Sequence, residues 1–232
     1  MDKAKRKAII AGNWKMNKTA SEAAVLVDEL IPAVKDASCE VVICTPYTDL
    51  VTAVAKTKGT NIHVGAENVH FEKSGAFTGE ISADMLVDLG VEYVIVGHSE
   101  RRKYHPEDDA NIVDQVRAVL AAGMQPILCV GESFEERRQG IELDFAVGQV
   151  RDVTRDLNEE QAAKLIVAYE PVWAIGTGMV ATPQSAQDAA NAIRNDLKTT
   201  FGTKVSDSVR ILYGGSVTSK NAAELISQPD VD

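Results

Sequence analysis

Short apolar segments alternate with helical patterns along the whole chain, and this alternation constrains the fold more than any other feature. Seven of these segments have the length and the content of β-branched residues that are typical of buried strands. Strands that alternate with helices form right-handed βαβ units and a parallel sheet, so the predicted fold class is α/β. The expected strands are 8–13, 41–44, 62–66, 93–96, 125–130, 165–169 and 209–213.

Capping signals mark the ends of several expected helices. Thr19 and Glu22 have the spacing of a capping box, and Ser133 and Glu136 repeat that spacing. Gly90 follows the short helical segment 82–89 in the position of a C-cap. Further helices are expected at 20–34, 46–58, 109–122, 143–157, 182–201 and 219–226.

The composition is that of an ordinary globular protein, and 232 residues are enough for one α/β domain. No linker rich in Pro, Gly or Ser divides the chain, so we expect residues 1–232 to form a single domain. No apolar run approaches about 18 residues and no signal-peptide core follows the basic start, which predicts a cytoplasmic protein. A net charge of −10 makes a nucleic acid or an anionic membrane an unfavourable partner.

The cysteines Cys39, Cys44 and Cys129 form an odd set without C-x-x-C spacing. Two of them lie inside apolar strand-like segments. We therefore expect buried thiols rather than a disulfide or a zinc site.

The alternation alone permits either an open doubly wound sheet or a barrel. The first strand lacks the pattern G-x-G-x-x-G, and no phosphate-binding G-x-x-x-x-G-K-[ST] motif is present, which counts against an open nucleotide-binding sheet. Polar residues instead follow the strands at matching places, and the carboxyl ends of barrel strands are where active sites form. These residues are Asn13, Lys15, His98, Glu100, Glu132, Glu170 and Ser216.

The segment after the sixth strand has the composition of a lid over Glu170. It is small and apolar, carries two glycines, and ends where Thr182-Pro183 marks the start of a helix. An apolar loop of this kind can exclude water from a neighbouring carboxylate. An ordinary strand-to-helix connection is the alternative that this segment alone leaves open. The predicted lid comprises Pro171, Val172, Trp173, Ala174, Ile175, Gly176, Thr177 and Gly178.

Four motifs, in the right order, resemble the triosephosphate isomerase family, and the resemblance covers the whole chain. It implies a (β/α)8 TIM barrel. It also implies an isomerase that interconverts dihydroxyacetone phosphate and D-glyceraldehyde 3-phosphate through an enediol(ate), in glycolysis and gluconeogenesis, without a metal or an organic cofactor. The motifs are Ala11-Gly12-Asn13-Trp14-Lys15-Met16-Asn17, Val96-Gly97-His98-Ser99-Glu100-Arg101-Arg102, Ala168-Tyr169-Glu170-Pro171-Val172-Trp173-Ala174-Ile175-Gly176-Thr177-Gly178 and Tyr213-Gly214-Gly215-Ser216-Val217.

The resemblance assigns Glu170 as the base that takes a proton from carbon, and a carboxylate beside an apolar lid suits that task. His98 would be a neutral hydrogen-bond donor to the carbonyl oxygen, at the start of a helix expected from Ser99. Lys15 would stabilise the enediolate and the phosphate, an attraction of about 4 kcal/mol at about 4 Å. Asn13 would orient Lys15. Glu100 would either hold Lys15 or serve as a simple ion-pair partner.

Phosphate binding is expected from backbone N–H groups at Gly176 and Ser216, the latter after the double glycine Gly214-Gly215. Asn13 and Lys15 would complete the substrate contacts.

The segment Asn68–Glu80 is long and carries Phe77, so we expect it to insert into a second copy of the chain and form a homodimer. By resemblance, Thr78 would approach the partner subunit's Asn13 and the partner subunit's Lys15. Glu80 would approach the partner subunit's Arg101.

The sequence departs from the family pattern in three places. Met179-Val180 follows the lid where a lysine is common, and Tyr104-His105-Pro106-Glu107-Asp108 differs from the usual sequence there. Seven strands are found where the family's barrel has eight, so the eighth βα unit is missing and we expect the full protein to extend beyond Asp232. Two other interpretations stay open at this point: another phosphate-binding barrel such as a sugar-phosphate epimerase, and a catalytically silent barrel that serves in assembly.

Overall fold

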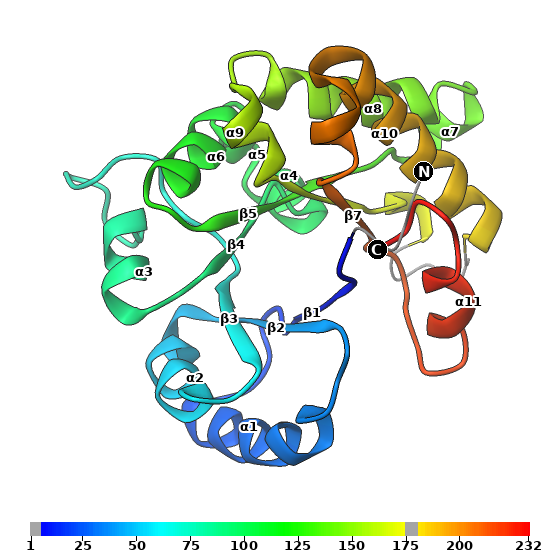
Figure 1. Cartoon of the computed structure of the whole chain (residues 1–232). Helices are drawn as coiled ribbons and strands as arrows, with labels where there is room; N and C mark the ends of the chain where they lie inside the picture. The colour runs from blue at the N-terminus through cyan, green and yellow to red at the C-terminus, as the bar shows by residue number, and fades with distance from the viewer. Residues whose placement is uncertain (1–5, 175–180) are drawn as a thin grey trace. The chain divides into compact units, whose positions relative to one another are not determined.

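The computed structural model describes residues 6–174 and 181–232, and it confirms the alternation of strands and helices (Figure 1). The chain forms two compact units. Among the described residues, the N-terminal unit comprises 8–96 and 114–126, and the C-terminal unit comprises 6–7, 97–113, 127–174 and 181–232. One helix and one strand, α6 (Ile112–Ala121) and β5 (Gln125–Val130), continue from one unit into the other.

Four neighbouring parallel strands form the sheet of the N-terminal unit, in the order in which they occur along the chain. The register pairs Ile9 with Glu40 and Val41 with Ile62. Figure 1 shows α1 and α2 side by side along β1 to β3. The elements are β1 (Ile9–Asn13), α1 (Ala20–Val34), β2 (Glu40–Thr45), η2 (Tyr47–Asp49), α2 (Leu50–Thr57), β3 (Ile62–Ala66), α3 (Ala83–Leu89) and β4 (Tyr93–Val96).

Three strands, β5 to β7, are parallel neighbours in the C-terminal unit, and their register pairs Cys129 with Ala168 and Ala168 with Leu212. The long helix α10 packs beside α8 and α9 (Figure 1). The remaining elements are α4 (Ser99–Tyr104), α5 (Pro106–Asp109), α7 (Phe134–Arg138), α8 (Glu142–Thr154), α9 (Glu159–Ala163), β6 (Ile166–Tyr169), η3 (Val172–Ala174), α10 (Pro183–Ser206), β7 (Arg210–Tyr213) and α11 (Ala222–Ile226).

The predicted helix ends are confirmed where a capping residue marked them. Thr19 and Ser133 both make complete capping boxes, and Gly90 ends α3 in the left-handed conformation with φ 90°. The predicted helix 143–157 ends earlier, at Thr154. Asn158 caps a separate helix, α9, because its side chain accepts a hydrogen bond from the Gln161 N–H at 2.9 Å.

Two other predicted helices differ from the structure. The predicted helix 109–122 begins later, at Ile112 of α6, and a separate short helix, α5, ends at Asp109. The predicted helix 219–226 also begins later, at Ala222. The helix expected over 182–201 extends as α10 to Ser206, with Gly202 at φ 82° and ψ 173° breaking the helical geometry where the sequence predicted its end. Glycine tolerates that conformation without a steric penalty.

Several strands are buried along most or all of their length, as expected of a parallel sheet covered by helices, whereas in β1 only Ile9 is buried. Every residue of β4 and of β6 is buried. Polar residues therefore appear abruptly where these strands end: His98 two residues after β4, and Glu170 directly after β6. In the part of the chain that the structure describes, none of the helices combines the length and the apolar composition that a membrane crossing requires.

Candidate active site

The C-terminal unit brings His98 and Glu170 together. His98 is the N-cap of α4, and its Nε2 lies 3.2 Å from Glu170 Oε1. The backbone N–H of Ser99 donates to the other carboxylate oxygen, Glu170 Oε2, at 3.1 Å. Both side chains are almost completely buried, so their interaction is only weakly screened by water.

A second hydrogen bond determines which nitrogen of His98 carries the proton. The backbone N–H of Glu100 donates to His98 Nδ1 at 3.2 Å. Because Nδ1 accepts this hydrogen bond, the proton of a neutral ring is on Nε2, which faces the carboxylate of Glu170. The Glu100 Oε2 lies 3.8 Å from Nδ1, beyond hydrogen-bonding distance. In this arrangement Nε2 is the donor of a neutral His98 ring, and its role toward a substrate carbonyl stays a prediction.

Two glycines make room for Glu170. A Cβ atom at Gly131 would lie 1.8 Å from the carbonyl oxygen of Glu170, and one at Gly214 would lie 2.8 Å from Glu170 Cγ. Gly214 also donates its N–H to the carbonyl of Tyr169 at 2.7 Å. A larger residue at either position would displace the carboxylate. Gly214, for which the resemblance predicts a role in phosphate binding, therefore also makes room for Glu170.

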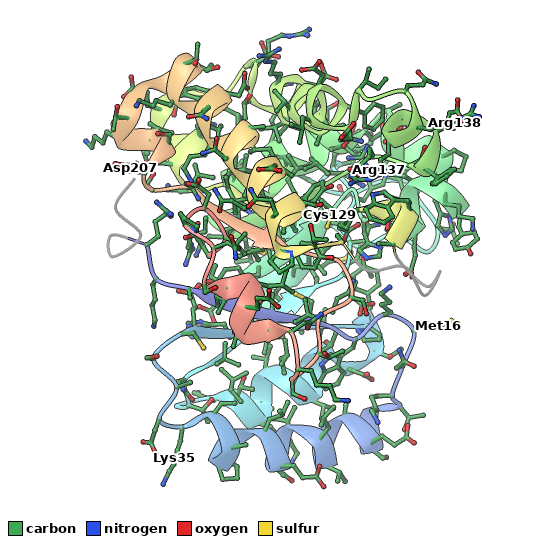
Figure 2. The ribbon with its side chains drawn as sticks, turned by 90° about the vertical axis from the view of Figure 1, so that its right-hand side faces the viewer. Met16, Lys35, Cys129, Arg137, Arg138 and Asp207 are labelled. Carbon is green, nitrogen blue, oxygen red and sulfur yellow. The ribbon has the colours of Figure 1, made fainter. Side chains whose placement is uncertain are left out.

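A buried carboxylate, Glu132, anchors the first residues of the predicted lid. Its Oε1 accepts hydrogen bonds from the Tyr169 hydroxyl at 3.0 Å and from Trp173 Nε1 at 2.7 Å. Arg137 contacts the same oxygen at 3.3 Å, and its guanidinium lies 4.4 Å from the centre of the Trp173 ring. Burial, with the nearby charge of Glu132, raises the pKa of the Tyr169 hydroxyl, which stays protonated as a donor. Figure 2 shows Arg137 on the inner side of α7 and Arg138 at its outer edge.

The described part of the lid is a 3-10 turn at Val172–Ala174. Val172 donates its N–H to the carbonyl of Glu132 at 3.1 Å, and Ala174 donates to the carbonyl of Pro171 at 2.8 Å. These contacts fix the segment that leaves Glu170. The other residues of the predicted lid and the departure that follows it lie outside the described residues: Ile175, Gly176, Thr177, Gly178, Met179 and Val180.

Asn13 and Lys15 lie in the N-terminal unit, where the end of β1 brings them together. The side chain of Asn13 accepts a hydrogen bond from the backbone N–H of Lys15 at 3.0 Å. Lys15 has φ 55°, a left-handed conformation that costs a non-glycine residue about 1–3 kcal/mol. Such strain is often kept at functional positions. Met16 beside it is 97% exposed (Figure 2). The approach of Lys15 to Glu170 and to Glu100 stays a prediction.

The loop after β7 holds Ser216, whose side chain is exposed. Its carbonyl accepts a hydrogen bond from Asn221 Nδ2 at 3.0 Å, and Asn221 Oδ1 accepts one from the Thr218 N–H at 2.7 Å. Asn221 therefore holds this loop in shape from the start of α11. Ser216 follows the double glycine Gly214-Gly215. A Cβ atom at Gly215 would lie 2.2 Å from the hydroxyl of Tyr213, so a larger residue there would displace the Tyr213 ring.

Sequence reasoning missed several residues that the structure adds to the site. The sequence analysis places Tyr169 at the end of a strand and assigns its hydroxyl no contact. No pattern in the sequence predicts the contact of Arg137 with Trp173. Gly131 could have been found, because it directly follows a strand at the end where the other site residues lie. In the segments 6–174 and 181–232, no cluster of three or more His, Cys, Asp or Glu side chains is arranged to hold a metal ion.

Comparisons with known proteins agree with this geometry. The model of the triosephosphate isomerase family matches residues 8–232. The triosephosphate isomerase of Bifidobacterium longum is 75% identical over 235 residues, which cover 98% of this chain and 88% of that protein. That of Bifidobacterium adolescentis is 66% identical, with 98% and 89% covered, and that of Clostridium botulinum (strain Eklund 17B) is 49% identical, with 98% and 92% covered.

The match to the family model runs through every strand and every described site residue, and the identities to three proteins of the family are far above the level at which fold and chemistry diverge. The parallel strands and alternating helices are those of the family's TIM barrel. The chain belongs to the triosephosphate isomerase family, and it is an isomerase that interconverts dihydroxyacetone phosphate and D-glyceraldehyde 3-phosphate.

Proposed function

We propose that Glu170 is the general base of this isomerase and that His98 is the donor that polarises the substrate carbonyl. The observation that carries the proposal is the buried pair itself, with Nε2 of His98 3.2 Å from Oε1 of Glu170. A substrate that replaces this direct contact presents a C–H to the carboxylate and a carbonyl oxygen to the ring N–H. Both groups are then within reach of neighbouring carbons of the triose.

The proposed reaction moves one proton between two carbons. Glu170 removes the proton from the first carbon, and the electron pair shifts to the carbonyl oxygen, where the Nε2–H of His98 stabilises the developing enediolate. The protonated Glu170 returns the proton to the neighbouring carbon, and the hydroxyl proton of the first carbon moves to the former carbonyl oxygen, so that the first carbon becomes the new carbonyl. The steric space at Gly131 and Gly214 supports this role, because the carboxylate needs a defined position relative to the substrate.

Substrate binding is proposed for the polar groups that the resemblance assigns. Lys15, with Asn13 beside it, supplies a positive charge for the phosphate and the enediolate, and Glu100 holds Lys15. Backbone N–H groups of Gly176 and Ser216 bind the phosphate, and Gly214 and Gly215 allow the chain to approach it closely. The lid, Pro171–Gly178, covers the site and excludes water.

Replacement of Glu170 by Gln tests the role of the base. The amide keeps the size of the side chain but cannot accept the proton, so we expect kcat to fall by about 10²–10⁴ with a small change in KM. A coupled isomerase assay measures both constants. Glu160→Gln, an exposed position on α9, is the matched control and keeps normal turnover. Near-normal turnover of Glu170→Gln would disprove the assignment.

We propose further that the chain forms a homodimer through Asn68–Glu80. This segment is ordered although most of it is exposed: the His70 ring stacks on Phe71 with centroids 4.5 Å apart and contacts Phe77 at 4.3 Å. Phe77 is 42% exposed. An ordered loop with an exposed aromatic side chain supports insertion into a second copy, with Thr78 and Glu80 facing the partner.

Sedimentation velocity tests the dimer. We expect a dimer at micromolar protein and a monomer with reduced activity after Phe77→Asp, because a carboxylate would have to be buried in the interface. Val51→Asp, which changes another exposed apolar residue of the same unit, is the control. A fully active monomer of the unchanged protein would refute the proposal. We also propose a cytoplasmic location, which fits the glycolytic reaction, and a single domain over 1–232.

A further inference from the structure

Arg102, on α4, is outside the proposed catalytic set, and its guanidinium makes several hydrogen bonds close to His98 and Glu170. Its Nε donates to the carbonyl of Gly97 at 2.8 Å, and its Nη2 donates to the carbonyl of Cys129 at 3.0 Å. Its Nη1 pairs with Asp109. The side chain of Arg102 is 21% exposed, so the two carbonyl contacts are largely protected from water.

The first contact holds the backbone immediately before His98. Gly97 has φ 70°, and a Cβ atom there would lie 2.9 Å from Arg102 Nη2. The guanidinium therefore occupies space that is free only because position 97 is glycine. The backbone N–H of Arg102 also donates to the carbonyl of His98 at 3.1 Å. Backbone and side chain of one residue thus fix the peptide groups on both sides of the imidazole.

The second contact connects this turn to the strand beside Glu170. Cys129 lies within β5 in the interior of the C-terminal unit (Figure 2) and is paired with Ala168 of β6. One residue further along, Val130 accepts a hydrogen bond from the N–H of Glu170 at 2.7 Å. Arg102 therefore joins the main chain that carries the proposed donor to the strand pair that carries the proposed base.

We propose that Arg102 is a positioning residue for the isomerisation, which sets the position of His98 relative to Glu170 by bridging the carbonyls of Gly97 and Cys129. The inference rests on the proposed roles of His98 and Glu170. A planar guanidinium with several fixed donors can hold two carbonyls at once, whereas an ammonium group cannot do so in the same geometry. A displacement of a reacting group by about 1 Å can reduce a rate by about 10².

Arg102→Met keeps most of the side-chain stem and removes both donors. We expect kcat to fall by about 10- to 100-fold while KM and the inhibition constant of inorganic phosphate change by less than about threefold, because the phosphate contacts are made elsewhere. The kcat of Arg102→Lys should lie between that of Arg102→Met and that of the unchanged protein. Lys103→Met, which removes a cation from the same helix, is the matched control for charge and should keep normal kinetics. Urea unfolding shows whether each variant is folded.

The decisive measurement is a double-mutant cycle between Arg102→Met and His98→Gln. If Arg102 acts through the imidazole, its replacement costs little further activity once the imidazole is gone, and the two effects are strongly non-additive. Additive losses would overturn the proposal, as would a normal kcat for Arg102→Met or a rise in KM at constant kcat. If Met prevents folding, Arg102→Lys decides the same question, and failure of both to fold overturns it.

The same isomerase assay distinguishes failure of the positioning role of Arg102 from failure of the roles proposed for His98 and Glu170. Loss of turnover in His98→Gln and Glu170→Gln with normal kinetics in Arg102→Met rejects only the positioning role. Normal turnover in His98→Gln and Glu170→Gln rejects the proposed function, whatever Arg102 does.

Discussion

The C-terminal unit contains two buried groups of charged and polar side chains that are built on opposite principles. The first is the site pair, His98 and Glu170. The second is the terminal charge cluster, in which Arg194 and Arg6 face two aspartates near residue 232. Arg194 is completely buried and makes five hydrogen bonds, three of them to the main-chain carbonyls of Ser206, Val209 and Asp230. The terminal charge cluster comprises Arg6, Arg194, Asp230 and Asp232.

The two groups differ in how completely their carboxylates are paired. Asp232 Oδ2 accepts from Arg6, Arg194 and the backbone N–H of Ile211. Glu170 Oε2 accepts from one backbone N–H, and its Oε1 faces the ring of His98. A carboxylate that accepts many hydrogen bonds is held in one position, whereas one that accepts few keeps lone pairs for a further contact, as the base proposed at Glu170 requires. Pairing, rather than burial, distinguishes the terminal charge cluster from the site pair.

The largest expected effect is on stability, from Arg194→Met. Removal of the cation leaves Asp230 buried without a cationic partner and leaves Asp232 with Arg6 alone, and breaking a buried pair in this way costs about 3–5 kcal/mol. Urea unfolding measures the free energy of unfolding. Arg155→Met, at an exposed position after α8, is the control and should change stability by less than about 0.5 kcal/mol. A loss below about 1 kcal/mol for Arg194→Met would show that the cluster does not hold the unit together.

The second effect is on catalysis, from His98→Gln. Loss of a preorganised donor to the developing oxyanion should reduce kcat by about 10²–10³, or about 2.7–4 kcal/mol. The free energy of unfolding should change by less than about 1 kcal/mol, because Glu170 keeps its bond from the Ser99 N–H. His63→Gln, a half-exposed histidine paired with Glu92, is the control for both measurements. Destabilisation as large as that of Arg194→Met would remove the distinction between the two groups.

The sequence predicted the site pair and could not predict the terminal charge cluster. Glu170 directly follows a buried apolar strand and His98 comes two residues after another, so both stand at strand ends and within motifs that resemble the family. Arg6 and Asp232 are separated by 226 positions and neither belongs to a sequence motif. They become neighbours only in the folded chain. Arg102 lies within the second motif, but its hydrogen bond to the carbonyl of Cys129 connects segments that no local signal predicts to be neighbours.

A smaller effect is expected from Gln187→Leu, which removes part of the pairing and leaves the cations in place. Gln187 donates to Asp230 Oδ2 at 2.7 Å and accepts from the Asp230 N–H at 2.9 Å. A hydrogen bond to a charged group contributes about 1.5–3 kcal/mol, and Asn191 still donates to the same oxygen, so we expect a loss near the lower limit. Gln184→Leu, which breaks one exposed bond to Asp188, is the control. Equal losses in both variants would mean that burial adds nothing to this bond.

The smallest effect is the acid dependence of stability that Asp230 contributes. Burial alone would raise the pKa of this carboxyl, but hydrogen bonds from Asn191 and Gln187, with Arg194, lower it overall below its ordinary value of 3.8. The contribution of Asp230 to stability is therefore complete above pH 3.8, the ordinary pKa that it has in the unfolded chain. It is lost as the pH falls through the lower pKa of the folded protein.

Urea midpoints measured from about pH 6 down to about pH 3 should fall less steeply for Asp230→Asn than for the unchanged protein, because that variant has no proton to bind at this position. Asp188→Asn, at an exposed position on the same helix as Gln187, keeps the original slope. If Asp230→Asn and the unchanged protein lose stability in parallel, Asp230 is not held ionised by its partners. The complete pairing that distinguishes the terminal charge cluster from the site pair would then contribute nothing measurable to the free energy of unfolding.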